Sequence, residues 1–162
     1  MPILVDLAFD NQDVIIINAA IAQWNYALNG WLHLHIVGYV FVDDAELTKY
    51  HSGWLFVKAL STDKLTIMHD KEQKPGYHAL GFVNDIGGNQ LFIIRERLDN
   101  EQVLGILLHE IGHLLGAQHD EAGLMVQYYN EIDYQCIDEN TIKEIAVHEK
   151  LPVATLNYCT LD

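Results

Sequence analysis

The residues best suited to chemistry lie in one short stretch of this 162-residue chain, residues 109–120, which reads His-Glu-Ile-Gly-His-Leu-Leu-Gly-Ala-Gln-His-Asp. Residues four apart share one face of an α-helix, so His109 and His113 can direct two ring nitrogens at one metal ion. Gly116 allows the chain to turn back, because glycine adopts left-handed conformations without steric cost, and His119 then reaches the same ion. Three protein ligands leave a fourth position for water, which is typical of catalytic zinc.

Glu110 stands beside the first histidine, where its carboxylate can take a proton from a zinc-activated water and pass it to a leaving amine. That chemistry is peptide-bond hydrolysis. Two other interpretations remain: a zinc-stabilised binding protein without catalysis, and a site for another metal such as iron. A structural site has no need of a carboxylate beside its first ligand, so Glu110 favours an enzyme. The histidine pair on a helix with an adjacent glutamate favours zinc.

The extended motif, followed closely by a methionine, resembles the signature of the metzincin metallopeptidases, and the matrixins show the most similar pattern. Met125 follows the third histidine in the run Ala-Gly-Leu-Met, where the metzincins have their Met-turn. The resemblance implies a zinc endopeptidase with the three histidines as ligands, Glu110 as general base and Met125 as an apolar floor beneath the ion. Asp120 would orient the loop or a ligand, although a plain solvated acid is nearly as well supported.

The resemblance covers nearly the whole chain and implies one catalytic domain of mixed α/β (α+β) class. The metzincin fold has a twisted, mostly parallel sheet, an antiparallel edge strand, an active-site helix, the Met-turn and a C-terminal helix. Residues 1–116 would form the N-terminal subdomain and residues 117–162 the C-terminal one.

An extended peptide or protein substrate would pair with the backbone of the edge strand, which the resemblance places over residues 77–82. Tyr129 would lie in the wall of the S1′ pocket. The residues of the edge strand expected to contact the substrate are Ala79, Leu80 and Gly81.

In its accessory metal sites the chain departs from the matrixins. The run Gly87-Gly88-Asn89 resembles a calcium-holding loop, but asparagine replaces the expected aspartate. His69, Asp70 and His78 lie in a turn much shorter than the matrixin loop with a structural zinc, and the last histidine of that site has no match. We therefore expect one catalytic zinc ion, with calcium as a secondary candidate.

Composition limits the partners. The length suits one domain, and 9 basic against 23 acidic residues leave a formal net charge of -14. This charge argues against nucleic acid and anionic membrane surfaces, which require basic side chains. The most apolar run, residues 14–22, is too short to span a membrane. The N-terminus lacks the features of a signal peptide, whereas the family resemblance implies secretion, so the compartment stays open. We expect a monomer.

Hydrophobic periodicity and capping residues predict the elements that position the site. Helices are expected over residues 13–29, 100–115 and 138–150. Strands are expected over residues 3–9, 32–42, 65–68, 77–83 and 91–95. The resemblance makes 65–68 the central strand; residues 43–52 form a loop or short helix, and 54–60 stay unassigned. The helix over 100–115 is apolar on nearly all faces, so it should be buried, and its histidines and glutamate then need a partner.

The two cysteines, Cys136 and Cys159, can pair within the chain only with each other. A bridge would tie the start of the last helix to the C-terminus. Two free buried thiols are at least as well supported, because small disulfide-stapled domains usually carry more cysteines.

Overall fold

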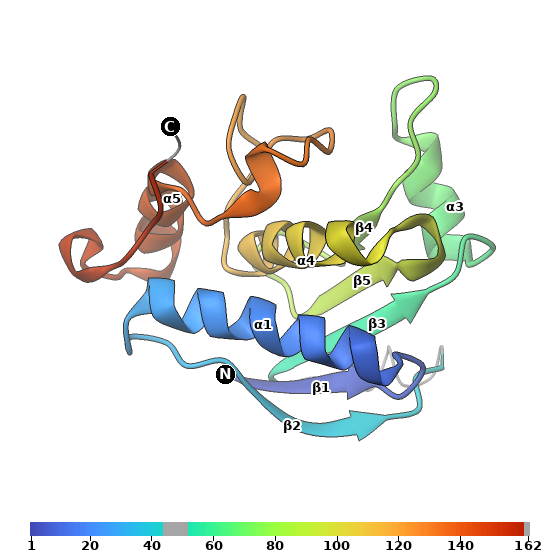
Figure 1. The fold of residues 1–162 in the computed structure, drawn as a ribbon, viewed down its shortest axis with the longest axis horizontal. Helices are drawn as coiled ribbons and strands as arrows, with labels where there is room; N and C mark the ends of the chain where they lie inside the picture. Colours follow the sequence, from blue (N-terminus) through green and yellow to red (C-terminus); the bar gives the residue numbers. More distant parts are fainter. Residues whose placement is uncertain (44–51, 161–162) are drawn as a thin grey trace.

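A five-stranded sheet forms the body of the computed structural model, which describes residues 1–43 and 52–160 (Figure 1). Its strands are β1 (Pro2–Asp6), β2 (His35–Val40), β3 (Trp54–Ala59), β4 (Gly81–Val83) and β5 (Gln90–Ile94). They lie in the order β2-β1-β3-β5-β4, and all neighbouring pairs are parallel except β4 with β5. The prediction of a mixed α/β fold, with a mostly parallel sheet and an antiparallel edge strand, is therefore confirmed.

Four α-helices accompany the sheet in the described residues. They are α1 (Asn11–Leu28), α3 (Lys64–Lys71), α4 (Asn100–Leu114) and α5 (Glu139–Glu149). α1 packs against α4, and Trp24 donates its indole N–H to the backbone oxygen of Leu108 over 3.2 Å. α4 also packs on β4 and β5, whereas α5 stands apart from the sheet (Figure 1). None of the described helices is long and apolar enough to cross a membrane.

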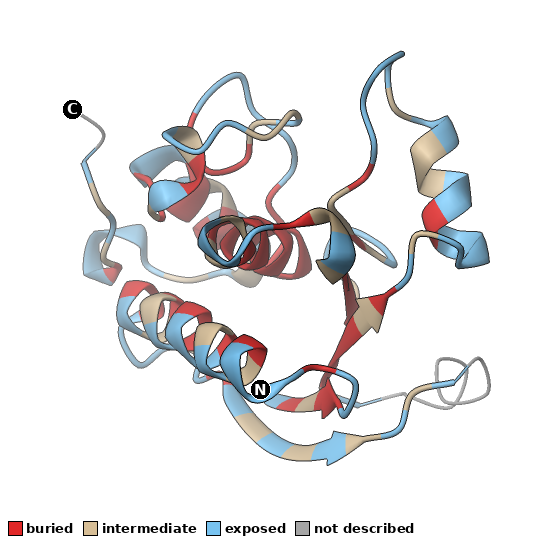
Figure 2. Cartoon of the chain, turned by 45° about the vertical axis from the view of Figure 1, so that its right-hand side comes forward, coloured by how far each residue is buried: buried red, intermediate tan, exposed pale blue. Residues whose placement is uncertain are grey.

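The main core fills the space between the sheet and the pair α1 and α4. Successive side chains of a strand point to opposite faces. In β3, Trp54 and Phe56 therefore join this core, while Leu55 and Val57 join a second apolar cluster on the other face. α4 is the most deeply buried helix, because every residue from Gly105 to Leu114 is buried. In Figure 2 the central helix is mostly red, the colour of buried residues.

The predicted helices agree with the structure to within two residues at each end. Capping explains this agreement, because a cap is read from a few neighbouring residues. Asp99 and Gln102 form the predicted capping box at the start of α4. Asp138 accepts the N–H of Thr141 over 3.0 Å as the N-cap of α5. Of the segment 43–52, predicted to be a loop or short helix, residues 44–51 lie outside the described part of the chain.

The prediction of a central strand over residues 65–68 is wrong. These residues lie in α3, where only Thr66 is buried, and the central strand is β3, which had no assignment. A strand buried on both faces shows a continuous apolar run without alternation, so periodicity alone does not distinguish it from a helix. In the exposed helix α3, four consecutive apolar or β-branched residues were mistaken for a strand.

The edge strand is shorter than predicted. Only Gly81–Val83 pairs with β5, whereas residues 77–80 have no strand structure. Here a side-chain ion pair binds the backbone of Ala79 in place of a neighbouring strand, as described below.

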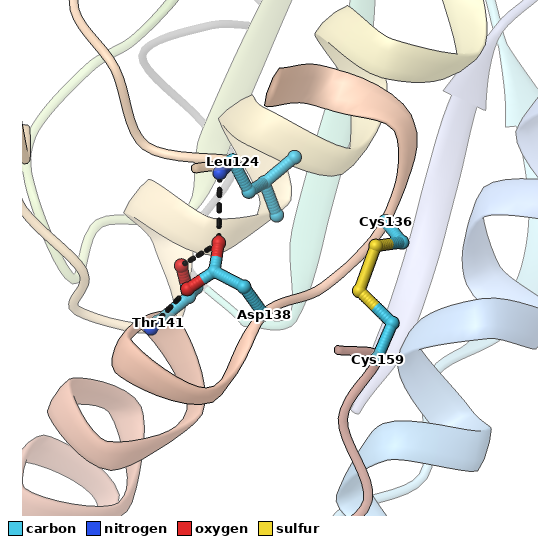
Figure 3. Close-up of a disulfide and its surroundings, with 5 residues drawn as sticks. All are labelled: Leu124, Cys136, Asp138, Thr141 and Cys159. Carbon is cyan, nitrogen blue, oxygen red and sulfur yellow. Dashed lines mark hydrogen bonds between the residues drawn. A yellow bond between two sulfur atoms is a disulfide. The ribbon is translucent and has the colours of Figure 1, made fainter. Parts of the chain in front are cut away.

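Cys136 and Cys159 form a disulfide, so the alternative of two free thiols is wrong (Figure 3). The N–H of Cys159 also donates to the oxygen of Ile137 over 2.8 Å. Together these two contacts attach the C-terminal segment to the residues that lead into α5.

We expect the disulfide to contribute about 3 kcal/mol to the free energy of unfolding, because it closes a loop of 23 residues in the unfolded chain. The double variant Cys136→Ser/Cys159→Ser should lose this amount in urea denaturation. Reducing agent should lower the stability of the natural protein to the same level and leave the variant unchanged. Equal stability of the two oxidised proteins would contradict this expectation.

Candidate metal centre

Three histidine side chains meet at the C-terminal end of α4. His109 and His113 lie one turn apart on the helix, and His119 follows the turn after it. The candidate ligand atoms of the three rings lie within 4.8 Å of one another, and the Nε2 atoms of His113 and His119 are 3.1 Å apart. No other group of three potential metal ligands is found in the described residues. The structure thus brings together all three predicted ligands.

The Nδ1 atoms of two histidine rings, those that point away from the candidate metal position, each contact a backbone carbonyl oxygen. Nδ1 of His109 lies 2.7 Å from the oxygen of Leu124, and Nδ1 of His113 lies 2.7 Å from the oxygen of Ala117. In a neutral imidazole, the Nδ1–H that donates to a carbonyl leaves a lone pair on Nε2. Both lone pairs are then available to one ion, the arrangement in which a second hydrogen bond orients a metal-ligating histidine.

Burial keeps these rings neutral. It lowers the pKa of His109 to about 3, with a further contribution from neighbouring His113. Burial also lowers the pKa of His113 to about 4 and lowers that of His119. A metal ion binds only neutral imidazole, so the donors are ready for a cation such as zinc at neutral pH.

Gly116 makes the turn between the second and third histidines, as predicted. Its φ is +105°, and the turn closes with a hydrogen bond of 2.9 Å from the N–H of Ala117 to the oxygen of Gly112. A Cβ atom at Gly116 would lie 2.1 Å from Cγ of His148, so both the backbone angle and the neighbouring ring require glycine. This turn places the carbonyl of Ala117 against His113.

Met125 is buried beneath α4. Its sulfur lies 2.7 Å from the position that a Cβ atom would take at Gly112, so that glycine lets the two segments touch. The N–H of Asp120 donates to the oxygen of Met125 over 2.8 Å, which holds the His119 segment beside the turn around Met125. The side chain of Asp120 is exposed and accepts the N–H of Glu121.

Asp138 anchors the same turn from the other side, a role that sequence reasoning missed. Its buried carboxylate accepts the N–H of Leu124 over 2.8 Å as well as the N–H and hydroxyl of Thr141 (Figure 3). Leu124 in turn offers its oxygen to His109. One residue, Leu124, therefore connects the cap of α5 with the first candidate ligand through its N–H and its oxygen.

Glu110 is buried next to these histidines, and its Oε2 atom has no hydrogen-bond partner among the residues that the structure describes. Burial raises the pKa of this carboxyl to about 8. The side chain lines a cleft of about 590 Å³ together with His109 and His119. An unpartnered buried carboxyl costs stability, so this position points to a role that requires it.

Tyr134 is a second residue of the site that sequence reasoning missed. Its buried ring stacks on His109 with centroids 4.7 Å apart, and its hydroxyl donates to the oxygen of Val126 over 2.5 Å. Tyr129, predicted to line a pocket wall, packs edge-on against Tyr134 and lines the cleft. Gly105 carried a signal for this contact, because a glycine inside an apolar helix often marks a close approach; a Cβ there would lie 3.0 Å from Cβ of Tyr134.

The predicted substrate contacts Ala79, Leu80 and Gly81 all line the cleft, but their backbone groups differ. The N–H of Ala79 donates to Asp70 over 2.9 Å, and its oxygen accepts from Arg97 over 2.7 Å. Arg97 and Asp70 form a two-point ion pair. The oxygen of Leu80 accepts the N–H of Ile94. Since peptide groups alternate in direction along an antiparallel strand, those of Gly81 point to the outer edge.

The accessory metal sites find no support in the described residues. Both oxygens of Asp70 bind Arg97, and the ring of His69 stacks on Phe82 at 4.0 Å. In the loop proposed for calcium, the side-chain oxygen of Asn84 accepts the N–H groups of Asn89 and Gln90. Hydrogen bonds thus organise this loop, and calcium is not supported.

Comparison with known proteins places the fold. No protein-family model and no curated protein matches the chain. Seventeen chains of solved structures match it. One of them is archaemetzincin from Methanopyrus kandleri, with a TM-score of 0.54, 15% identity, and coverage of 82% of this chain and 83% of that chain. The chain thus has an archaemetzincin-like fold that carries three histidines able to bind a metal ion.

We expect Asp138→Ala to weaken both stability and metal binding. The change leaves the N–H of Leu124 unpaired and releases the carbonyl that orients His109. The free energy of unfolding should fall by about 3 kcal/mol, and zinc affinity, measured against a chromogenic chelator, about tenfold or more. Asp10→Ala removes the matching N-cap of α1. It should cost only about 1 kcal/mol and leave zinc affinity unchanged. Equal zinc affinities of the two variants would contradict the role of Asp138.

The raised pKa of Glu110 by itself should cost the metal-free protein stability as pH rises from about 4.5 to about 8, because this carboxyl ionises earlier in the unfolded chain than in the folded one. Glu110→Gln should lack this loss, so its advantage over the natural protein grows across that range, by about 1.4 kcal/mol per unit of pKa difference at most. The buried histidines act in the opposite direction below pH 6.5. They are common to both proteins and cancel in the comparison. Urea denaturation at several pH values measures the difference, and a constant difference would contradict the prediction.

Proposed function

We propose that this protein is a zinc-dependent endopeptidase that hydrolyses extended peptides or proteins. One observation carries the proposal: the buried Glu110, whose Oε2 atom has no partner in the described part of the chain, lies in a cleft beside three convergent histidine nitrogens. The likeness of the fold to archaemetzincin supports the same class of activity. A purely structural metal site gives no reason for a buried carboxyl at this cost, so a non-catalytic binding protein explains less of the structure.

His109, His113 and His119 would hold the zinc ion. When bound there, zinc would polarise the scissile carbonyl and lower the pKa of a water molecule toward ~7. Glu110 would take the proton of that water through its free Oε2 atom and pass it to the leaving amine. Burial raises the pKa of this carboxyl in the metal-free protein, and a cation bound by the neighbouring histidines would lower it and so favour the carboxylate that accepts the proton. The Met-turn around Met125 would support the ligands from below.

The substrate would lie along the outer edge of β4. Gly81 offers its peptide N–H and oxygen to an extended chain, whereas those of Ala79 and the oxygen of Leu80 already have partners within the protein. Ala79 and Leu80 would contribute the surface of the cleft. On the opposite side, Tyr129 would border the pocket for the side chain after the scissile bond.

Replacing Glu110 with glutamine tests the mechanism. The variant should cleave casein at least about a hundredfold more slowly, because general acid–base catalysis typically contributes 10²–10⁴ in rate. Zinc content, measured by elemental analysis, should stay the same, since the ligands are untouched. Glu139→Gln, an exposed change on α5, serves as the control and should keep full activity. Mass-spectrometric profiling of a peptide library with both proteins would locate the cleaved bonds, and full activity of the Glu110 variant would overturn the mechanism.

A further inference from the structure

Three side chains meet at the rim of the cleft, and we name them the Lys74 bridge: Lys74, Tyr77 and Tyr128. The ammonium group of Lys74 lies 4.3 Å from the ring centre of Tyr77 and 4.0 Å from that of Tyr128. The two rings also contact each other, with centroids 4.7 Å apart. A cation placed over the faces of two aromatic rings attracts both, so the lysine holds the tyrosines together.

The two tyrosines come from opposite sides of the cleft. Tyr77 belongs to the segment between α3 and β4, whose residues 76–81 line one side. Tyr128 belongs to the segment after Met125, whose residues 127–129 line the other. Figure 1 shows both segments rising on the same side of α4. The Lys74 bridge therefore joins the two walls across the cleft, while His109, Glu110 and His119 lie at its floor.

The cleft has the size of a ligand site. Its volume of about 590 Å³ lies within the range of roughly 300–1,000 Å³ typical of sites for small ligands. Lys74 and Tyr77 are exposed to solvent, and the contacts among the three side chains are noncovalent. A peptide with a free end can pass between the walls beneath the bridge. A closed loop has no end to insert, so it can enter only when the two rings separate.

We propose that the Lys74 bridge restricts the cleft to peptide chains that enter by a free end, and so selects short linear peptides over closed loops of folded proteins. This selection rests on the proposed peptidase function and adds a limit on its substrates. Lys74 and Tyr128 act here as specificity determinants, because they decide which chains reach the floor of the cleft.

The test measures binding to the zinc-loaded protein in which Glu110→Gln prevents turnover. The probes are fluorescein-labelled decapeptides of casein, each prepared in linear form and cyclised head to tail, and the readout is fluorescence anisotropy. With the bridge intact, the linear peptides should bind about tenfold or more tightly than their cyclic forms. Adding Lys74→Met removes the cation and retains most of the apolar stem, so the cyclic peptides should gain about tenfold in affinity. Tyr128→Ala should reduce the ratio of linear to cyclic affinity in the same direction.

Two exposed residues away from the cleft provide matched controls. Lys143→Met on α5 and Tyr26→Ala on α1 remove the same chemical groups and should leave the ratio unchanged. Equal binding of linear and cyclic peptides to the protein with an intact bridge would contradict the proposed selection by the Lys74 bridge. It would not affect the proposed peptidase function. The same holds for a Lys74 variant that keeps the original ratio. Failure of every linear peptide to bind would instead overturn the proposed function, and the bridge as a substrate filter with it.

Discussion

Polar side chains in the middle of a buried apolar helix are the constraint on which this structure depends. α4 buries His109, Glu110 and His113 among leucines and isoleucines. A buried polar group without a partner costs about 1–3 kcal/mol. The chain after the helix returns twice to supply partners, with the oxygen of Ala117 for one histidine and the oxygen of Leu124 for the other. Glu110 alone keeps an oxygen without one.

Close packing around α4 follows from this constraint, and glycines make it sterically feasible on three sides. Gly112 admits the sulfur of Met125, Gly105 admits Tyr134, and Gly81 brings β4 against Ile106 and Glu110. In each case a Cβ atom would lie about 3 Å or less from its neighbour. The segment after the helix is then fixed from outside, because Asp138 binds Leu124 and the nearby disulfide ties in the C-terminal segment (Figure 3).

The cleft separates a rigid floor from an adjustable rim. The floor belongs to α4 and the turn that follows it, where backbone oxygens hold the rings of His109 and His113. The rim consists of two loop segments that touch through a lysine and two tyrosines, with noncovalent contacts only. The fixed metal donors thus lie at the floor of the cleft. The substrate path, which has to open, lies at its rim. The fold is shared with archaemetzincin at 15% identity, so this likeness concerns the backbone, and the site has to be argued from its own residues.

Local sequence by itself determined the helices α1, α4 and α5 and the histidine cluster. A pair four residues apart, a turn glycine and a capping aspartate act within one or two helical turns, so their spacing along the chain already defines their geometry. Tertiary structure alone decided the central strand β3, the disulfide, the contact of Tyr134 with His109, and the ion pair that occupies the backbone of Ala79. These contacts join residues that lie at least 18 positions apart in the chain. No local pattern encodes such a distance, because it is set by how the elements pack around α4.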